Sequence, residues 1–239
     1  MSRVRVYIEN AYFGEAIEIN DRDILHKLKE VLRLSKGKQL YIFDGRGKEC
    51  SYDLEFLDKK QCILKKVGSV ICQEQPALKL AIGFPLMVED KVDFILQKCT
   101  ELGVDCFFPF ICRRSRNQSI GEKKVIRWKK IIAEAVRQSN RRWFPGLVFP
   151  MRFEDLINTK YENKVVSDFK GSYFKDSETC FDKDTIVVIG PEGDFDSDEY
   201  RDLNRQGFKP IKLSEATLRT ETAVVFAAGL FSLSRLNRN

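Results

Sequence analysis

Two short segments near the carboxyl end of the chain decide how we interpret its fold. Residues 187–194 read V-V-I-G-P-E-G-D, an apolar run that ends in a glycine-bracketed turn. Residues 213–223 read L-S-E-A-T-L-R-T-E-T-A, a polar loop that leads into an apolar helix. A buried strand that breaks at such a turn delivers a loop to the carboxyl edge of a sheet, where α/β proteins bind ligands. We therefore expect both segments to line a ligand site at that edge.

The composition is that of a soluble globular protein of one or two domains. Of the 239 residues, 43% are hydrophobic and 32% are charged. No apolar run approaches the roughly 20 residues that span a bilayer. The first five residues, M-S-R-V-R, lack the apolar core of a secretion signal. We therefore expect a cytoplasmic protein that does not enter a membrane.

Cysteine and histidine usage argues against metal chemistry. The seven cysteines are dispersed without a C-x-x-C pair, and His26 is the only histidine. This pattern predicts neither a disulfide framework nor a zinc site. The single histidine also argues against a nucleophile that is activated by histidine. We expect no bound metal.

The amino-terminal part alternates in the manner of short strands. Strands are expected at residues 3–9, 39–43, 49–57 and 61–67, with a helix followed by a turn at 21–34 and a D-G-R-G hairpin turn at 44–47. This pattern predicts a small β-barrel-like domain. The polar segment Gln73–Pro76 is typical of a linker, so we divide the chain into domains at residues 1–73 and 77–239.

The second domain alternates strands and helices. Strands are expected at residues 78–84, 104–111, 164–169, 185–189 and 209–213, and helices at 89–102, 123–142, 196–207 and 220–236. Asp196 followed by Glu199 is a capping-box pattern for the third of these helices. The alternation predicts an α/β fold with a mainly parallel sheet and helices on both faces.

Charge is distributed unevenly along the chain, whose net charge is +6. Arg113–Trp143 contains eleven Lys or Arg residues and two Glu residues, whereas Glu178–Asp202 contains nine acids and two basic residues. This asymmetry indicates a polyanionic partner that touches one face. A solvated basic helix face is the alternative explanation. The candidate phosphate contacts in this region are Arg113, Arg114, Arg116, Arg137, Arg141 and Arg142. Arg33 and Arg46 are weaker candidates in the first domain.

The two opening segments have structural explanations as well as functional ones. The glycines at 190 and 193 suit a tight turn or the close approach of a ligand, and they match neither G-x-G-x-x-G nor a P-loop. Thr220 as N-cap and Glu221 in the first turn suit a helix start. Capping leaves Arg219 unexplained, because a cation beside the positive helix end is unfavourable unless an anion comes near.

The chain resembles the RsmE family, the 16S ribosomal RNA uridine-N3 methyltransferases of the SPOUT superfamily. Six segments carry the resemblance in the correct order: residues 26–34, 43–47, 98–104, 135–139, 189–193 and 218–223. The resemblance implies a PUA-like RNA-binding barrel at residues 1–73 and a SPOUT domain with a deep trefoil knot at 77–239. It also implies S-adenosylmethionine as cofactor, a homodimer, and a uridine near the 3′ end of 16S rRNA, naked or in the assembled small subunit, as substrate.

The resemblance assigns roles to the two loops. The residues expected to bind the cofactor are Ile189, Gly190, Pro191, Glu192, Gly193, Leu213, Ser214, Leu218 and Thr220. Arg219 is expected to stabilise the uridine anion, and Glu221 or Glu192 to take its proton. Asp194 and Ser214 stand where the family usually has glycine. Because Asp tolerates a left-handed backbone and Ser is small, both loops can still form.

Two other functions fit the same residues. One is a SPOUT enzyme that methylates another RNA position, including a ribose hydroxyl. The other is a non-catalytic RNA-binding assembly factor, which the replacements at Asp194 and Ser214 favour.

Overall fold

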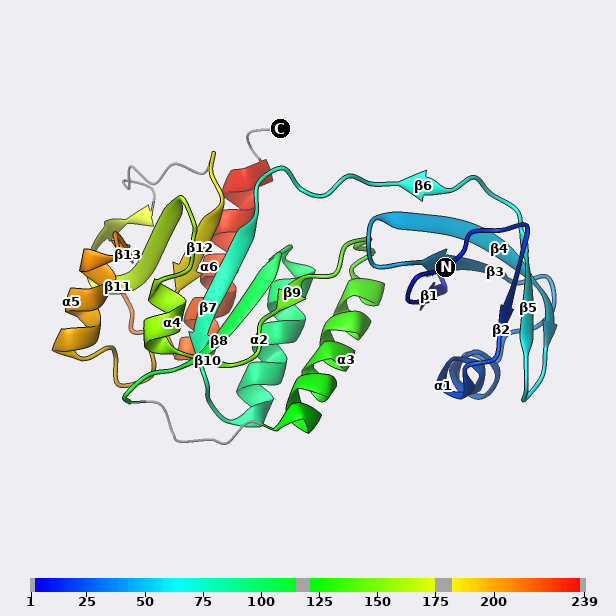
Figure 1. Cartoon of the computed structure of the whole chain (residues 1–239), viewed down its shortest axis with the longest axis horizontal. Coiled ribbons are helices and arrows are strands. Elements are labelled where there is room, and N and C mark those ends of the chain that lie inside the picture. Colours follow the sequence, from blue (N-terminus) through cyan, green and yellow to red (C-terminus); the bar gives the residue numbers. More distant parts are fainter. Residues whose placement is uncertain (1–2, 115–120, 175–181, 237–239) are drawn as a thin grey trace. The chain divides into compact units, whose positions relative to one another are not determined.

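The computed structural model describes residues 3–114, 121–174 and 182–236. They form two compact units (Figure 1). Unit 1 consists of Met1–Gln75 together with Val136–Phe144, and unit 2 consists of Pro76–Ala135 and Pro145–Asn239. The chain thus returns to unit 1 for one short segment between two parts of unit 2.

Unit 1 is built on one six-stranded sheet. Its strands are β1 (Arg5–Tyr7), β2 (Ala16–Ile19), β3 (Gln39–Phe43), β4 (Lys48–Leu57), β5 (Cys62–Lys66) and β6 (Ile71–Cys72). The order is β1-β3-β4-β5-β2, with β6 beside β4. β1 and β3 run parallel and the other neighbours run antiparallel. Alternate residues of β3 and β4, among them Leu40, Ile42, Tyr52 and Leu54, are buried in one core. The expected small β domain is confirmed, whereas β2 was not predicted because only one of its four side chains is buried.

The helix followed by a turn that was expected at residues 21–34 is confirmed. Asp21 accepts a hydrogen bond from the backbone of Ile24 at 2.9 Å and caps α1 (Arg22–His26), which continues as a π-helical turn, η1 (Lys27–Val31). Leu28 is buried, but Val31 is 63% exposed. The chain leaves the helix before Arg33, whose φ of 49° is left-handed.

Unit 2 contains a seven-stranded sheet in which every pair of neighbours is parallel. Its strands are β7 (Leu80–Pro85), β8 (Cys106–Ile111), β9 (Gly146–Leu147), β10 (Met151–Arg152), β11 (Asn163–Tyr173), β12 (Thr185–Val188) and β13 (Lys209–Lys212). The order is β10-β8-β7-β12-β11-β13, with β9 beside β8. β12 therefore lies between β7 and β11, and the carboxyl ends of β11, β12 and β13 meet at one edge.

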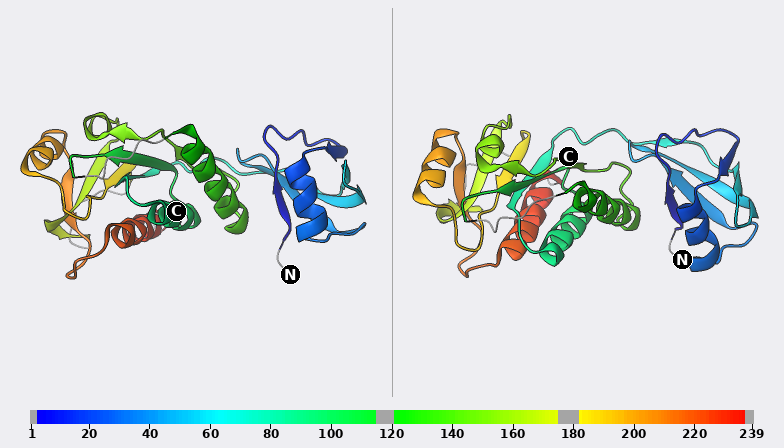
Figure 2. Two further views of the ribbon diagram at one scale, coloured as in Figure 1. Left: turned by 90° about the horizontal axis from the view of Figure 1, so that it is seen from below. Right: turned by 60° about the horizontal axis from the view of Figure 1, so that its bottom comes forward.

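Helices cover both faces of this sheet, as expected. They are α2 (Glu89–Glu101), α3 (Glu122–Gln138), α4 (Phe153–Ile157), α5 (Ser197–Arg205) and α6 (Thr220–Leu236). Figure 2 shows α4 and α5 on one face and α2 and α6 on the other. An aromatic cluster fills the first of these interfaces, including Phe108, Phe110, Phe153, Phe195 and Phe208. The mainly parallel α/β architecture is confirmed.

The local expectations for unit 2 hold where the sequence signal is strong. Asp196 caps α5, and the Glu199 side chain accepts from the Asp196 backbone at 2.9 Å, which completes the predicted capping box. α4, β9 and β10 were not predicted, because segments of two to five residues carry too little periodicity. No helix in the described ranges is long and apolar enough to cross a membrane.

Candidate active site

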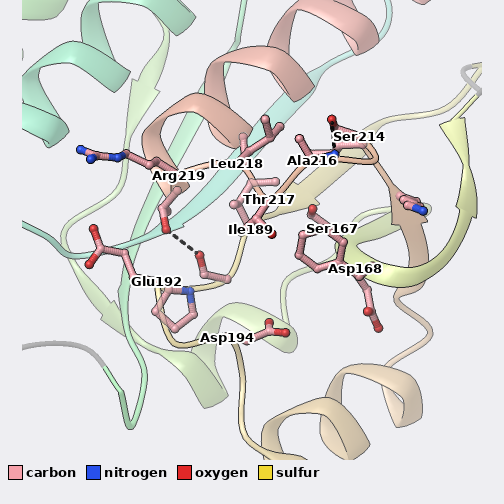
Figure 3. A pocket seen from close by; sticks show the side chains of 17 residues that line it. Ser167, Asp168, Ile189, Glu192, Asp194, Ser214, Ala216, Thr217, Leu218 and Arg219 are labelled. Carbon is pink, nitrogen blue, oxygen red and sulfur yellow. Dashed lines mark hydrogen bonds between the residues drawn. The ribbon is translucent and has the colours of Figure 1, made fainter.

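A pocket of about 510 Å³ opens at the carboxyl edge of the unit 2 sheet. Three segments form it (Figure 3): residues within β11, the loop after β12, and the end of β13 with the loop that follows it. Its lining consists of Ser167, Asp168, Phe169, Ile189, Gly190, Pro191, Glu192, Asp194, Lys212, Leu213, Ser214, Ala216, Thr217, Leu218, Arg219, Thr220 and Ala223. The two segments that opened the sequence analysis therefore lie together at one site.

The first loop leaves β12 at Val188 and turns sharply. Asp194 donates its backbone N–H to the Pro191 carbonyl at 2.9 Å, which closes the turn. The φ of Asp194 is 60°, a left-handed conformation that explains why glycine suits this position and why Asp can replace it. A Cβ on Gly190 would lie only 3.2 Å from both the Phe195 ring and the Asp194 carboxylate. Gly190 thus lets its backbone lie against these side chains.

The Asp194 carboxylate has a defined orientation. Its Oδ1 accepts hydrogen bonds from the Tyr200 hydroxyl at 2.8 Å and from the Phe195 backbone at 2.9 Å. Burial and this bond to Asp194 both raise the pKa of Tyr200, which therefore stays a neutral donor. Asp194 therefore places an oriented negative charge in the lining of the pocket.

The second loop runs from β13 to the first turn of α6. Ser214 Oγ accepts a hydrogen bond from the backbone N–H of Ala216 at 3.1 Å, so this serine stabilises a local turn. Thr220 is the first residue of α6 rather than its N-cap, because Ala223 N donates to the Arg219 carbonyl at 2.9 Å. The Thr220 hydroxyl donates instead to the Gly190 carbonyl at 3.3 Å and joins the two loops.

A third segment of the pocket was missed by the sequence analysis. Ser167, Asp168 and Phe169 belong to β11, where the pairing with β13 is irregular between Ser167 and Ser172. Ser167 still pairs with Ile211, whereas Asp168 and Phe169 lie in the irregular part, and all three residues line the pocket. A signal was available, since polar residues follow the buried pair Val165–Val166 at the carboxyl end of a parallel strand.

A lysine that the sequence did not single out contacts both candidate bases. Lys91 Nζ on α2 lies 2.5 Å from Glu192 Oε1 and 3.2 Å from Glu221 Oε2. The hydrogen bond to Glu192 is the largest cause that raises the pKa of Lys91. Glu192 and Arg219 line the pocket, whereas Glu221 lies outside the lining. In Figure 3 the Arg219 and Glu192 side chains extend to the same side of the loops.

The basic residues before α3 are engaged with the α5 region. The Arg113 guanidinium lies 3.1 Å from both Asp196 and Asp198, and its backbone N–H donates to Glu199 at 2.9 Å. These acids raise the pKa of Arg113, with the hydrogen bond to Asp198 as the largest cause. Arg114 donates to the Gly193 carbonyl of the first pocket loop. Arg116 lies outside the described residues.

The other candidate phosphate-contacting arginines lie in unit 1. Arg33 and Arg46 are exposed, and Arg142 is 3.3 Å from the buried Glu49 carboxylate. Arg137 and Arg141 also lie in the returning segment Val136–Phe144. Their backbone carbonyls accept hydrogen bonds from Arg5 at 3.3 Å and 2.8 Å.

The D-G-R-G turn has a packing role that its sequence did not reveal. Gly45 and Gly47 have φ values of 71° and 98°. A Cβ on Gly45 would collide with the Phe144 ring, and one on Gly47 would collide with Trp143. Gly47 N donates to the Arg142 carbonyl at 3.0 Å, and Phe144 N to the Gly45 carbonyl at 3.0 Å. The turn thus holds the returning segment against the rest of unit 1.

Metal ligation has no structural support in the described ranges. They contain no group of three or more His, Cys, Asp or Glu residues that could hold a metal ion.

Comparison with known sequence families defines the class of protein. Residues 73–232 match the RNA methyltransferase domain family, and residues 19–67 match the RNA methyltransferase PUA domain family. The fold and the pocket at the carboxyl edge therefore belong to an RNA methyltransferase that carries an amino-terminal PUA domain.

Individual relatives define the family more closely. The ribosomal RNA small subunit methyltransferase E of Aquifex aeolicus is 39% identical over 93% of this chain and 96% of its own length. The protein of the same name from Bacillus subtilis is 28% identical over 87% of this chain and 86% of its own. A Legionella pneumophila methyltransferase, solved in complex with SAM, superposes with a TM-score of 0.88 and 28% identity over 98% of both chains. The chain belongs to the ribosomal RNA small subunit methyltransferase E family, which confirms the resemblance.

Proposed function

We propose that this chain transfers a methyl group from S-adenosylmethionine to N3 of a uridine near the 3′ end of 16S rRNA. The observation that carries the proposal is the pocket in which the loops after β12 and β13 are joined by the Thr220–Gly190 hydrogen bond. The family supports the RNA substrate, because its curated members are named as small-subunit rRNA methyltransferases. The Legionella structure, which shares the fold, contains SAM.

The pocket suits this cofactor in size and chemistry. A volume of about 510 Å³ lies in the range of small-molecule sites. Ile189, Leu213 and Leu218 supply apolar walls for an adenine ring. Backbone groups next to Gly190 and polar atoms of Glu192, Ser214 and Thr220 would orient the remainder, with Pro191 and Gly193 shaping the turn. When bound, the cofactor supplies a methyl group on a sulfonium sulfur.

The chain's own residues would then prepare the uridine. Uracil N3 must lose its proton before it can act as a nucleophile. Arg219 would stabilise the resulting anion. Glu192 lines the pocket beside Arg219, so it is better placed than Glu221 to accept the proton, directly or through water. Lys91, which contacts both carboxylates, would fix their positions.

RNA contact is assigned to the basic residues. Arg33, Arg46, Arg137, Arg141 and Arg142 would contact phosphates from unit 1. Arg113 and Arg114 would do so near the pocket, with Arg113 exchanging its acidic partners for phosphate. Arg116, outside the described residues, is a further candidate from the sequence. Such contacts make affinity fall steeply with salt.

Assembly and location complete the proposal. We propose a homodimer, because the adjacent helices α2 and α6 carry the exposed apolar side chains Phe94, Phe226 and Leu233. An rRNA substrate places the protein in the cytoplasm. The trefoil knot that the resemblance implies stays a prediction.

The central test is methylation of small-subunit particles from a strain that lacks the enzyme, compared with naked 16S rRNA, with the methyl position mapped by mass spectrometry. We expect Arg219→Ala to reduce methyl transfer by roughly 100-fold or more while calorimetry shows S-adenosylmethionine binding within about threefold of wild type. Arg152→Ala, which removes an exposed arginine of unit 2, is the control.

Three outcomes would contradict parts of the proposal. Near-normal turnover of the Arg219→Ala variant would remove Arg219 from the mechanism. A methyl group on a ribose or on another base would identify a SPOUT enzyme of different specificity. Failure of the wild-type protein to bind the cofactor would favour an RNA-binding assembly factor.

A further inference from the structure

The charges that line the pocket fall into two groups. Glu192 is paired with Lys91, and Lys212 is paired with Glu215 at 2.8 Å. The carboxylates of Asp168 and Asp194 instead accept hydrogen bonds from neutral donors in the described part of the chain, while the Arg114 guanidinium donates to the backbone carbonyl of Asp194 at 3.4 Å. Asp168 accepts from the Lys170 backbone at 2.9 Å, and Asp194 from Tyr200 and the Phe195 backbone. Both aspartates therefore belong to the pocket lining, and neither carboxylate takes part in an ion pair among the described residues.

The two aspartates lie apart from the proposed reaction groups. In Figure 3 Arg219 and Glu192 extend to one side of the loops, Asp168 lies on the opposite side, and Asp194 lies below. Their negative charge is therefore not placed beside the cation that we assign to the uridine anion. A positively charged ligand in the pocket would gain from both carboxylates.

Substrate and product of the proposed reaction differ by one unit of charge. S-adenosylmethionine carries an ammonium, a carboxylate and a sulfonium, so its net charge is positive. During transfer a bond forms between the methyl carbon and N3, the carbon–sulfur bond breaks, and its electron pair stays on sulfur. The nucleoside product, S-adenosylhomocysteine, is a neutral thioether zwitterion, and the uridine anion becomes a neutral methylated base.

We propose that Asp168 and Asp194 make the pocket charge-selective, so that it holds cationic S-adenosylmethionine more tightly than neutral S-adenosylhomocysteine. This inference rests on the proposed function. The φ of 60° at Asp194 and the bonds from Tyr200 and the Phe195 backbone hold this carboxylate in a fixed orientation. The consequence of the charge selectivity is weaker product inhibition. A unit charge several ångströms away in a pocket open to water changes the affinity of a cation by about three- to tenfold.

Calorimetry with the two nucleosides tests the proposal on the full-length protein. For Asp194→Asn and Asp168→Asn we expect S-adenosylmethionine to bind about three- to tenfold more weakly, with S-adenosylhomocysteine affinity changed by less than about twofold. Asn also tolerates the left-handed backbone at position 194. Asp155→Asn removes one exposed charge elsewhere in unit 2 and should leave the ratio of the two affinities unchanged.

A second measurement keeps folding effects separate. Tyr200→Phe removes the hydroxyl that orients Asp194 without changing any charge, so it should lower the ratio less than Asp194→Asn does. Thermal melting of each variant shows whether the fold is intact. In methylation assays the Asp variants should be inhibited by lower concentrations of S-adenosylhomocysteine than the wild type.

The outcomes separate this inference from the proposed function. An unchanged affinity ratio in both Asn variants would overturn the charge selectivity, even if methylation proceeds. Equal losses for both nucleosides would also overturn it, because the aspartates would then contact a group that both ligands share. If the wild-type protein binds neither nucleoside, the proposed function itself fails.

Discussion

Replacing Arg5 by methionine removes the centre of a buried charge cluster in unit 1. Arg5 is 3% exposed. Its Nε donates to Glu49 Oε2 at 2.7 Å, and its other nitrogens donate to the carbonyls of Val136, Arg137 and Arg141 at 3.1, 3.3 and 2.8 Å. The guanidinium also lies 4.2 Å from the centroid of the Phe43 ring. Burial lowers the pKa of Arg5 and Glu49 opposes that shift, so the side chain stays charged.

The magnitude follows from what the substitution leaves behind. The Glu49 side chain is only 4% exposed and would keep a single cationic partner, Arg142, at 3.3 Å. Breaking a buried ion pair by removing one partner costs about 3–5 kcal/mol. We expect the lower end, about 3 kcal/mol, because Arg142 compensates part of the charge. For a unit of this size each kcal/mol lowers the melting temperature by roughly 4 °C or more, so unit 1 should melt at least about 12 °C earlier.

Fluorescence can follow unit 1 alone. The chain has two tryptophans, and Trp143 belongs to unit 1, where its Nε1 donates to the carbonyls of Gln73 and Glu74. In a Trp128→Phe background, thermal melting by fluorescence therefore reports on unit 1. Arg3→Met is the control, since Arg3 is exposed and only stacks on Tyr41 at 5.0 Å. A shift below about 4 °C for Arg5→Met, or an equal shift for the control, would refute the reasoning.

Three further predictions concern Lys91 and the cysteines. Lys91→Met should lower kcat about tenfold, because the Glu192 and Glu221 carboxylates lose the cation that positions them, and Lys91→Arg should restore kcat. Lys98→Met, which breaks an exposed ion pair on the same helix, should leave kcat unchanged. Equal kcat values for both methionine variants would contradict this role of Lys91. The pKa of Lys91 is raised above 10.5, so the stability that its ion pairs contribute should be fully present below pH 10.5 and disappear as pH rises through the raised value; melting temperatures of wild type and Lys91→Met from pH 7 to 11 measure this. Burial raises the pKa of the Cys62 and Cys106 thiols to about 11, so iodoacetamide at pH 8 should label exposed Cys72 well before either; comparable labelling rates by mass spectrometry would count against it.

Features that arise from interactions between residues close together in the chain were predicted from the sequence, and features that arise from distant residues were not. The capping box of α5 and the strand–turn at Gly190–Gly193 arise from residues within a few positions of each other, and both were predicted. The exposure of Val31 was not, because its apolar side chain at helical spacing suggested a buried position, whereas it is 63% exposed.

The basic residues illustrate the same limit. The sequence shows how many arginines lie near α3, but not what each one contacts. Arg113 lies against Asp196 and Asp198, more than eighty positions away. Arg142 pairs with Glu49, and position 47 must be glycine because a Cβ there would collide with the Trp143 ring. Only the folded chain brings such distant groups within a few ångströms.

The sequence by itself determined the alternation of strands and helices and the two loops that line the pocket, because short-range propensity and turn chemistry encode these features directly. Its resemblance to known sequences in six ordered segments indicated the family. The tertiary structure decided the strand order that brings the ends of β11, β12 and β13 together. It also decided the entry of Asp168 into the pocket and the contact of Lys91 with both glutamates. Packing and electrostatic pairing depend on distances in space, and residues far apart in the chain acquire them only when the sheet has formed.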